Sequence, residues 1–365
     1  MKNIIDYVKN ELSSFEVKKF KAVDSLVLSQ FSYIYFERLV PGFSNETPPV
    51  RIGDLLKAEH FDTMFKGVMF LEKNLNLLYA LAASPRFRDI KMKYYVNKLD
   101  YKQEKQFSAV TYQIDDKTHY VSYRGTDMTF VGWKEDFNMA FQSPVPSQEE
   151  GVEYLNRAGK LLDGDLIVGG HSKGGNIAVY SAMKCSSEIQ NRIIKVYSHD
   201  GPGFKDSIFN TPEYLRIKDR IHKILPQSSI VGMLLQTQES YKVIKSSRSG
   251  IMQHDPFSWV IEGDDFHYVK NISNTSLNMN KALNEWLSNI SDEKRELFID
   301  ALFQTINSTN AKSIGDLSEV HIKDFAKILR AFRNIDSETR KFVSQTIRDL
   351  IVLYVKNLNP LNKQN

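Results

Sequence analysis

One serine in this chain lies in a context that favours nucleophilic chemistry. Residues 166–175 read Leu-Ile-Val-Gly-Gly-His-Ser-Lys-Gly-Gly, an apolar run that meets a glycine-rich turn before a helix-permissive stretch. A strand, a tight turn and a helix would hold Ser172 at the apex in a strained conformation, with its hydroxyl raised out of the sheet edge. Gly170 and Gly174 would leave room on both flanks. We predict that Ser172 is a nucleophile; the alternative is a glycine-rich turn without chemistry.

A serine hydroxyl attacks efficiently when a base takes its proton, and the base needs an orienting acid. The histidines that follow Ser172 are His199, His222, His254, His267 and His321. His254 lies between Gly250 and Pro256, which indicate a loop that can reach over the sheet edge. The others lie beside another candidate, in strand-like runs or in a helical region. We predict that His254 is the base; the alternative is a solvated loop histidine.

The orienting carboxylate is predicted one strand after the nucleophile. Asp200 follows the strand-like run 193–197 and precedes Gly-Pro-Gly. This position is the carboxyl end of a strand, where such folds gather their active sites. The next run ends at Ser228 and Ser229, where a carboxylate would be the more usual choice. We predict Asp200 as the acid; the alternative is a turn aspartate that holds its own loop.

The negative charge of a tetrahedral intermediate needs preorganised N–H donors. One donor is expected to be the main-chain N–H of Lys173, directly after the nucleophile. The other is expected from residues 123–127, where Gly125 permits a turn and Thr126 offers both an N–H and a hydroxyl. The alternative for this loop is an ordinary Gly-Thr turn.

The elements that would position these residues alternate between strands and helices. Strand-like runs occupy residues 90–99, 107–114, 119–123, 193–197, 222–225 and 241–244. Residues 115–117 predict a hairpin turn, and Ser147 with Glu150 predicts the capping box of a helix that runs to about residue 162. Strands separated by helices imply parallel pairing. The predicted fold class is α/β, with a mostly parallel central sheet.

Helical patterns flank this sheet region on both sides. Before it, Asp24 is expected to cap a helix whose apolar residues reach Tyr35. After about residue 273 the strand signals end, and apolar stripes such as the one around Phe298 predict amphipathic helices that pack onto the core. We therefore expect an α/β domain over residues 1–272, N-terminal helices included, and a helical cap or bundle over residues 273–365.

Composition narrows the classes of function. A net charge of +4 is small for 365 residues, and no basic stripe with interleaved aromatics stands out, which argues against a nucleic-acid binder. The single cysteine, Cys185, cannot form an intramolecular disulfide and is expected to be a small buried residue. Residues 1–19 lack the apolar core of a signal peptide, so we expect a cytoplasmic protein. No clustered ligand spacing suggests a metal, and we expect no cofactor.

Three segments resemble the class 3, fungal-type lipases: residues 121–126 (Val-Ser-Tyr-Arg-Gly-Thr), 132–136 (Gly-Trp-Lys-Glu-Asp) and 169–175. The resemblance covers about residues 65–270. It implies an α/β-hydrolase fold, Thr126 in the oxyanion hole, and structural roles for Trp133 and Asp136. Fungal-type lipases place their acid after the later strand, where this chain has serines. Pancreatic-type lipases place it one strand earlier, which suits Asp200.

The whole chain is more similar still to a family of bacterial α/β-hydrolases, the Mbeg-like proteins. The similar stretches are residues 23–30 (Val-Asp-Ser-Leu-Val-Leu-Ser-Gln), 200–204 (Asp-Gly-Pro-Gly-Phe) and 226–232 (Pro-Gln-Ser-Ser-Ile-Val-Gly). The activity of that family is inferred from its fold, so the resemblance implies architecture more firmly than substrate.

These residues together predict cleavage of carboxylic esters, with a lipid or another small acyl ester as substrate, through an acyl-enzyme on Ser172. Residues 231–235, Val-Gly-Met-Leu-Leu, either line an acyl site or begin a buried helix. One alternative is a non-catalytic lipid- or protein-binding scaffold on a hydrolase fold. Another is thioester cleavage or acyl transfer by the same residues. The C-terminal stripes leave peripheral membrane contact open.

Overall fold

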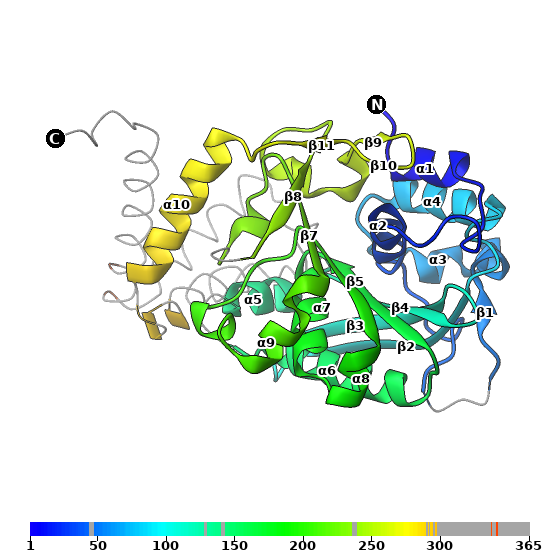
Figure 1. The fold of residues 1–365 in the computed structure, drawn as a ribbon, viewed down its shortest axis with the longest axis horizontal. Coiled ribbons are helices and arrows are strands. Elements are labelled where there is room, and N and C mark those ends of the chain that lie inside the picture. The colour runs from blue at the N-terminus through cyan, green and yellow to red at the C-terminus, as the bar shows by residue number, and fades with distance from the viewer. Residues whose placement is uncertain are drawn as a thin grey trace.

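A nine-stranded sheet forms the centre of the protein. The computed structural model describes residues 1–43, 47–127, 130–139, 143–235 and 239–289, with residues 291, 293, 294, 296, 297, 337 and 341. The strand order is β1-β2-β3-β4-β5-β6-β7-β8-β11 (Figure 1). These strands are β1 (Val50–Arg51), β2 (Lys91–Asp100), β3 (Lys105–Gln113), β4 (Thr118–Tyr123), β5 (Asp165–His171), β6 (Ile193–His199), β7 (Ile221–Pro226), β8 (Tyr241–Ile244) and β11 (Tyr268–Val269). A separate pair joins β9 (Ile261–Glu262) to β10 (Asp265–Phe266).

The pairing changes from antiparallel to parallel at β4. Strands β1 to β4 pair antiparallel, and β3 joins β4 through the predicted hairpin. Strands β4 to β8 pair parallel in sequence order, and β11 closes the edge antiparallel to β8. The predicted strands and the mostly parallel α/β class are confirmed. Because the parallel strands all run in the same direction, the carboxyl ends of β5, β6 and β7 lie at the same edge of the sheet.

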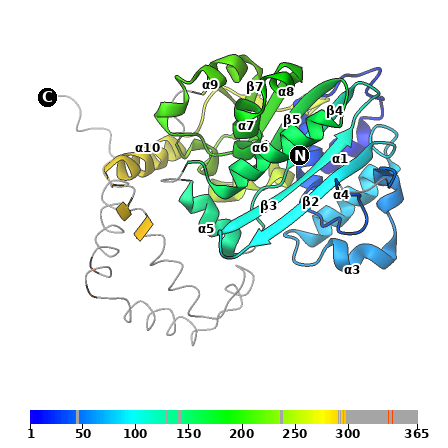
Figure 2. The ribbon, with the colours of Figure 1, turned by 90° about the horizontal axis from the view of Figure 1, so that it is seen from below.

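Helices cover both faces of the sheet (Figures 1 and 2). One face carries α1 (Ile4–Asn10), α2 (Ala22–Phe31), α3 (Phe61–Met64) and α4 (Leu71–Ala83), and the other carries α6 (Pro146–Lys160), α7 (Lys173–Lys184), α8 (Ser187–Arg192) and α9 (Pro212–Ile217). Successive side chains of a strand point to opposite faces. Tyr120 of β4 therefore packs with the first group, and its neighbour Val121 packs with the second. Each face buries its own hydrophobic core.

Asp24 caps helix α2 as predicted, but from inside the first turn and not from the residue before it. Helix α2 begins at Ala22, so Asp24 lies inside the first turn, where its carboxylate accepts a hydrogen bond from the N–H of Lys21 at 2.9 Å. The same buried carboxylate lies 2.7 Å from the guanidinium of Arg86. The helix also ends at Phe31, before the Tyr35 that the prediction included. An acidic residue in the first turn can accept a hydrogen bond from a free N–H at the start of a helix. The sequence pattern does not distinguish this position from the cap position.

The capping box predicted at Ser147 and Glu150 is wrong. Helix α6 begins at Pro146, a residue that suits the first turn because it has no N–H to satisfy. The side chain of Gln148 accepts a hydrogen bond from the N–H of Val145 at 3.0 Å. Glu150 instead binds Lys98 and Lys105 on the sheet side.

The C-terminal part of the chain is described only as far as helix α10 (Asn274–Asn289) and a few isolated residues. Helix α10 begins just after the domain boundary expected at residue 272. The apolar stripe around Phe298 lies outside the described residues.

Cys185 is buried as expected, and burial raises the pKa of its thiol to about 12. Within the described ranges, no helix is both long and apolar enough to cross a membrane.

The buried pair between Asp24 and Arg86 gives a test of this packing. Both side chains are 0% exposed. Asp24→Asn should lower the free energy of unfolding by about 3–5 kcal/mol, because it leaves a buried guanidinium without its counter-charge. The matched control is Asp54→Asn, which removes the exposed pair with Arg51 and should cost less than about 1 kcal/mol. Urea denaturation measures both, and equal losses would contradict the role of burial.

Candidate active site

The turn between β5 and α7 has the strained geometry expected of a nucleophile held between a strand and a helix. Ser172 adopts φ 59° and ψ −132°, a left-handed conformation that non-glycine residues rarely adopt. Its flanks require glycine: a Cβ on Gly170 would lie 2.3 Å from the main chain of Gly174, and a Cβ on Gly174 would lie 2.1 Å from the carbonyl oxygen of Tyr123. This close approach fixes Ser172 at the carboxyl edge of the sheet.

His254 lies between Ser172 and Asp200. Its Nε2 atom is 2.9 Å from the Ser172 Oγ atom, and its Nδ1 atom is 2.6 Å from the Asp200 Oδ2 atom. A carboxylate only accepts hydrogen bonds, so Nδ1 carries the proton and Nε2 is left to accept from the serine hydroxyl. The imidazole belongs to the short 3-10 helix Gly250–His254, and its side chain is 27% exposed. The structure thus brings together the three side chains that the sequence analysis selected.

Asp200 is held by residues of the loop after the next strand. It follows β6, has a φ of 52° and is buried. Its Oδ1 atom accepts a 2.5 Å hydrogen bond from the Ser229 hydroxyl and a 3.2 Å bond from the N–H of Gly232. A Cβ on Gly232 would lie 2.3 Å from this oxygen. Ser229, at the position where a carboxylate would be more usual, therefore donates to the candidate acid Asp200, a contact that the sequence analysis missed.

The sequence left two alternatives for residues 231–235, the lining of an acyl site or the start of a buried helix. The structure agrees with the second alternative at Met233. They begin with the 3-10 helix Val231–Met233, and Met233 is buried in a cluster with Leu225 and Val243. This packing is what the buried-helix alternative predicts for Met233.

The loop of Thr126 runs close beside Ser172. A Cβ on Gly125 would lie 2.6 Å from the carbonyl oxygen of His171 and 3.1 Å from the Ser172 Cβ atom. The Thr126 hydroxyl donates a 2.5 Å hydrogen bond to Asp136, a residue of α5 (Phe130–Asn138). Trp133 also lies in α5.

Lys173, the residue after Ser172, begins helix α7, and its main-chain N–H has no partner within the helix ladder. The positive end of the helix dipole adds to the attraction for an anion there. The side chain of Lys173 is 0% exposed and lies 2.9 Å from a carboxylate oxygen of Glu135 in α5. The ammonium group also donates to the main chain and side chain of Gln106. This ion pair ties the start of α7 to the helix that follows the Thr126 loop.

The other histidines of the C-terminal half take different places. His199 hydrogen-bonds to Ser25 at 2.9 Å, and burial lowers its pKa to about 3. His222 lies in β7, and burial lowers its pKa as well. His267 lies 2.8 Å from the exposed Glu262. His321 lies outside the described residues.

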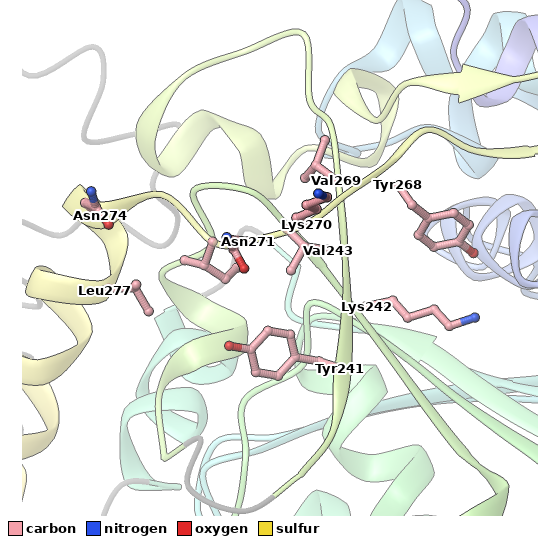
Figure 3. Close-up of a pocket in the computed structure, with 10 residues that line it drawn as sticks. Tyr241, Lys242, Val243, Tyr268, Val269, Lys270, Asn271, Asn274 and Leu277 are labelled. Atoms are coloured by element: carbon pink, nitrogen blue, oxygen red, sulfur yellow. The ribbon is translucent and has the colours of Figure 1, made fainter.

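A surface hollow of about 550 Å³ lies at the β8–β11 edge of the sheet, beside α10 (Figure 3). The residues that line it include Tyr241, Lys242, Tyr268 and Leu277, and do not include Ser172.

Among the residues that the structure describes, no three His, Cys, Asp or Glu side chains form a group that could hold a metal ion.

A family model of Mbeg1-like proteins matches residues 81–304, more than half of the chain. The chain belongs to the Mbeg1-like family. The resemblance to Mbeg-like proteins, expected from the sequence, is confirmed. A search of curated proteins finds no match to the chain.

Several solved lipase structures are similar to this Mbeg1-like chain at low identity. The M37 lipase is 17% identical with a TM-score of 0.36, over 59% of this chain and 70% of that chain. A fungal lipase–inhibitor complex is 14% identical with a TM-score of 0.40, over 62% and 79%. A deletion mutant of the Rhizomucor miehei lipase–propeptide complex is 15% identical with a TM-score of 0.39, over 67% and 76%.

Asp136 gives the site a titration that can be measured. Burial is the largest cause that raises the pKa of its carboxyl, from the usual 3.8 to about 6, while Lys173 and the Thr126 hydroxyl lower it. Between these two pH values the folded protein keeps a proton that the unfolded chain has released. The contribution of Asp136 to the free energy of unfolding therefore falls as the pH rises through this window.

Asp136→Asn should remove that contribution while keeping an oxygen that can accept from Thr126. The variant should gain stability relative to the wild type as the pH rises from 3.8 to about 6. Urea denaturation across this range measures the difference. A difference that stays constant with pH would show that the carboxyl does not titrate there.

Proposed function

We propose that this protein is a serine hydrolase that cleaves carboxylic esters of lipids or other acyl compounds. The observation that carries the proposal is the position of His254, 2.9 Å from the Ser172 hydroxyl and 2.6 Å from the Asp200 carboxylate. A base in contact with both a strained serine and a buried acid is the arrangement that nucleophilic catalysis needs.

In the first half of the proposed reaction, Ser172 Oγ attacks the acyl carbonyl carbon and its proton passes to His254 Nε2. Asp200 stabilises the imidazolium through Nδ1 without taking the proton itself. The carbonyl oxygen becomes negative, and we assign its donors as the main-chain N–H groups of Lys173 and Thr126. The Thr126 hydroxyl donates to Asp136, so the N–H is the group left for the substrate.

In the second half, the tetrahedral intermediate collapses and the C–O bond to the alcohol breaks. The alcohol leaves with the proton from His254 Nε2, and the acyl group stays on Ser172. Water then gives a proton to His254 and attacks the acyl carbon. A second collapse releases the carboxylic acid and returns the proton to Ser172. Attack by a different acceptor, or on a thioester, would use the same groups.

The acid in this proposal comes from the strand after the nucleophile, and its surroundings support that choice. The Ser229 hydroxyl and the Gly232 N–H both donate to Asp200 Oδ1, which leaves Oδ2 for His254. The contact between Asp200 and His254 supports catalysis over the scaffold alternative, because it supplies a carboxylate to the base although serines follow β7.

Replacement of the nucleophile is the first test. Ser172→Ala should lower the hydrolysis of short p-nitrophenyl esters on the order of 10⁴-fold or more, and a fluorophosphonate probe should label the wild type at Ser172 and leave the variant unlabelled. The control is Ser187→Ala, an exposed serine at the start of α8 that should keep full turnover and labelling. Equal turnover by the wild type and Ser172→Ala would refute the proposal.

The two neighbouring serines at the end of β7 test the position of the acid. Ser229→Ala removes a hydrogen bond to a charged group and should lower kcat roughly 10- to 100-fold. Ser228→Ala is the matched control, because its hydroxyl contacts Ser273 instead and the change should leave kcat near the wild-type value. A loss of similar size in both variants would argue against Asp200 as the orienting acid.

A further inference from the structure

The histidine next to the nucleophile contacts the main chain of the proposed base. His171 is the last residue of β5, and its side chain is buried. Its Nε2 atom lies 2.9 Å from the carbonyl oxygen of His254, and the two imidazole rings lie 4.5 Å apart, centroid to centroid. The residue before Ser172 therefore touches the residue that would take the proton from Ser172.

The partners of His171 fix where its proton is. A carbonyl oxygen only accepts, so Nε2 carries the hydrogen. Burial and the neighbouring His254 hold the pKa of His171 well below its ordinary value, so the ring is neutral and Nδ1 is an acceptor. The hydroxyl of Tyr33 lies 3.0 Å from Nδ1 and donates to it. The chain of donors therefore runs in one direction, from Tyr33 through His171 to the carbonyl of His254.

Tyr33 joins this chain to the loop of the proposed oxyanion hole. A Cβ on Gly125 would lie 2.2 Å from the Tyr33 hydroxyl, so the hydroxyl packs directly against that loop. Tyr33 follows α2, and this helix is held against the sheet by buried hydroxyls. Two serines of the helix and Ser32, the residue that caps its C-terminal end, bond to the strands as follows: Ser25 to Tyr120 and His199, Ser29 to Tyr120, and Ser32 to Tyr112 and Ser122.

We propose that His171 and Tyr33 are positioning residues that hold the main chain of His254, so that its imidazole stays between Ser172 and Asp200. The proposal rests on the proposed ester hydrolysis, and it gives neither residue contact with the substrate. The base lies on a short 3-10 helix and its side chain is partly exposed, so its place depends on what anchors that segment. An error of about 1 Å in the position of a reacting group can cost on the order of 100-fold in rate.

The test compares two replacements of His171. His171→Gln keeps an N–H donor near the place of Nε2, whereas His171→Leu removes it. His171→Leu should lower kcat on p-nitrophenyl esters by about 100-fold with little change in KM, because the substrate site is untouched. His171→Gln should recover at least about tenfold of that loss. Equal kcat values for the two variants would overturn the proposal.

Tyr33→Phe provides an independent variant, because it keeps the ring and removes the hydroxyl that orients His171. It should lower kcat by about tenfold, the value of one hydrogen bond. Tyr79→Phe is the control, since Tyr79 is an exposed tyrosine on α4 and should keep the wild-type kcat. A Tyr33→Phe variant with unchanged kcat would remove Tyr33 from the proposal. Circular dichroism and thermal unfolding show whether each variant is folded.

A second measurement does not depend on turnover. The proton between His254 Nδ1 and Asp200 should give a downfield ¹H NMR resonance, assigned by its loss in Asp200→Asn. The resonance should weaken or vanish in His171→Leu and persist in His171→Gln. If the wild type hydrolyses no ester and takes no fluorophosphonate, the proposed function fails, and this resonance still tests the positioning of His254. A resonance that is unchanged in His171→Leu would overturn the proposal.

Discussion

The left-handed backbone at Ser172 is the constraint on which the surrounding structure depends. A serine with a φ of 59° persists only where its neighbours leave no alternative. Strand β5 fixes one side of the turn and helix α7 fixes the other, and their main chains approach closely enough that only glycine fits at positions 170 and 174. Four segments then converge around Ser172: the turn itself, the loop of Thr126, the segment of His254 and the loop of Asp200.

Charged side chains are buried next to the place where these segments meet. Lys173 and Glu135 form an ion pair with both side chains 0% exposed, next to the strained residue. Such pairs cost desolvation energy and add little net stability, but a broken pair is expensive. The pair therefore favours one arrangement of α5 and α7 over near alternatives. The half-buried Asp136, with its raised pKa, places a second carboxyl in the same region.

Patterns local in the sequence predicted the central elements well. Alternating and apolar runs marked the strands, and Gly-His-Ser-Lys-Gly marked the turn, because both signals lie within a few neighbouring residues. The starts of α2 and α6 were misplaced, since Asp24 and Gln148 satisfy the helix starts from inside the first turn.

Contacts between distant residues were harder to predict. Ser229 reaches Asp200, and Tyr33 reaches His171 across 138 positions of the chain. Nothing in the neighbourhood of either residue encodes such a contact. A serine in a loop and a tyrosine after a helix are common, and only the fold shows which groups they meet.

The hydroxyl groups along α2 limit where the chain can be truncated without exposing buried side chains. The match to the Mbeg1-like family begins at residue 81, yet α1, α2 and most of α4 precede it. A fragment cut at that point would leave Tyr112 and Tyr120, now covered and hydrogen-bonded, facing water. It would also remove Asp24 and leave the guanidinium of Arg86 without its counter-charge. The opening helices therefore share one hydrophobic core and one set of hydrogen bonds with the sheet, although the family match begins after most of them.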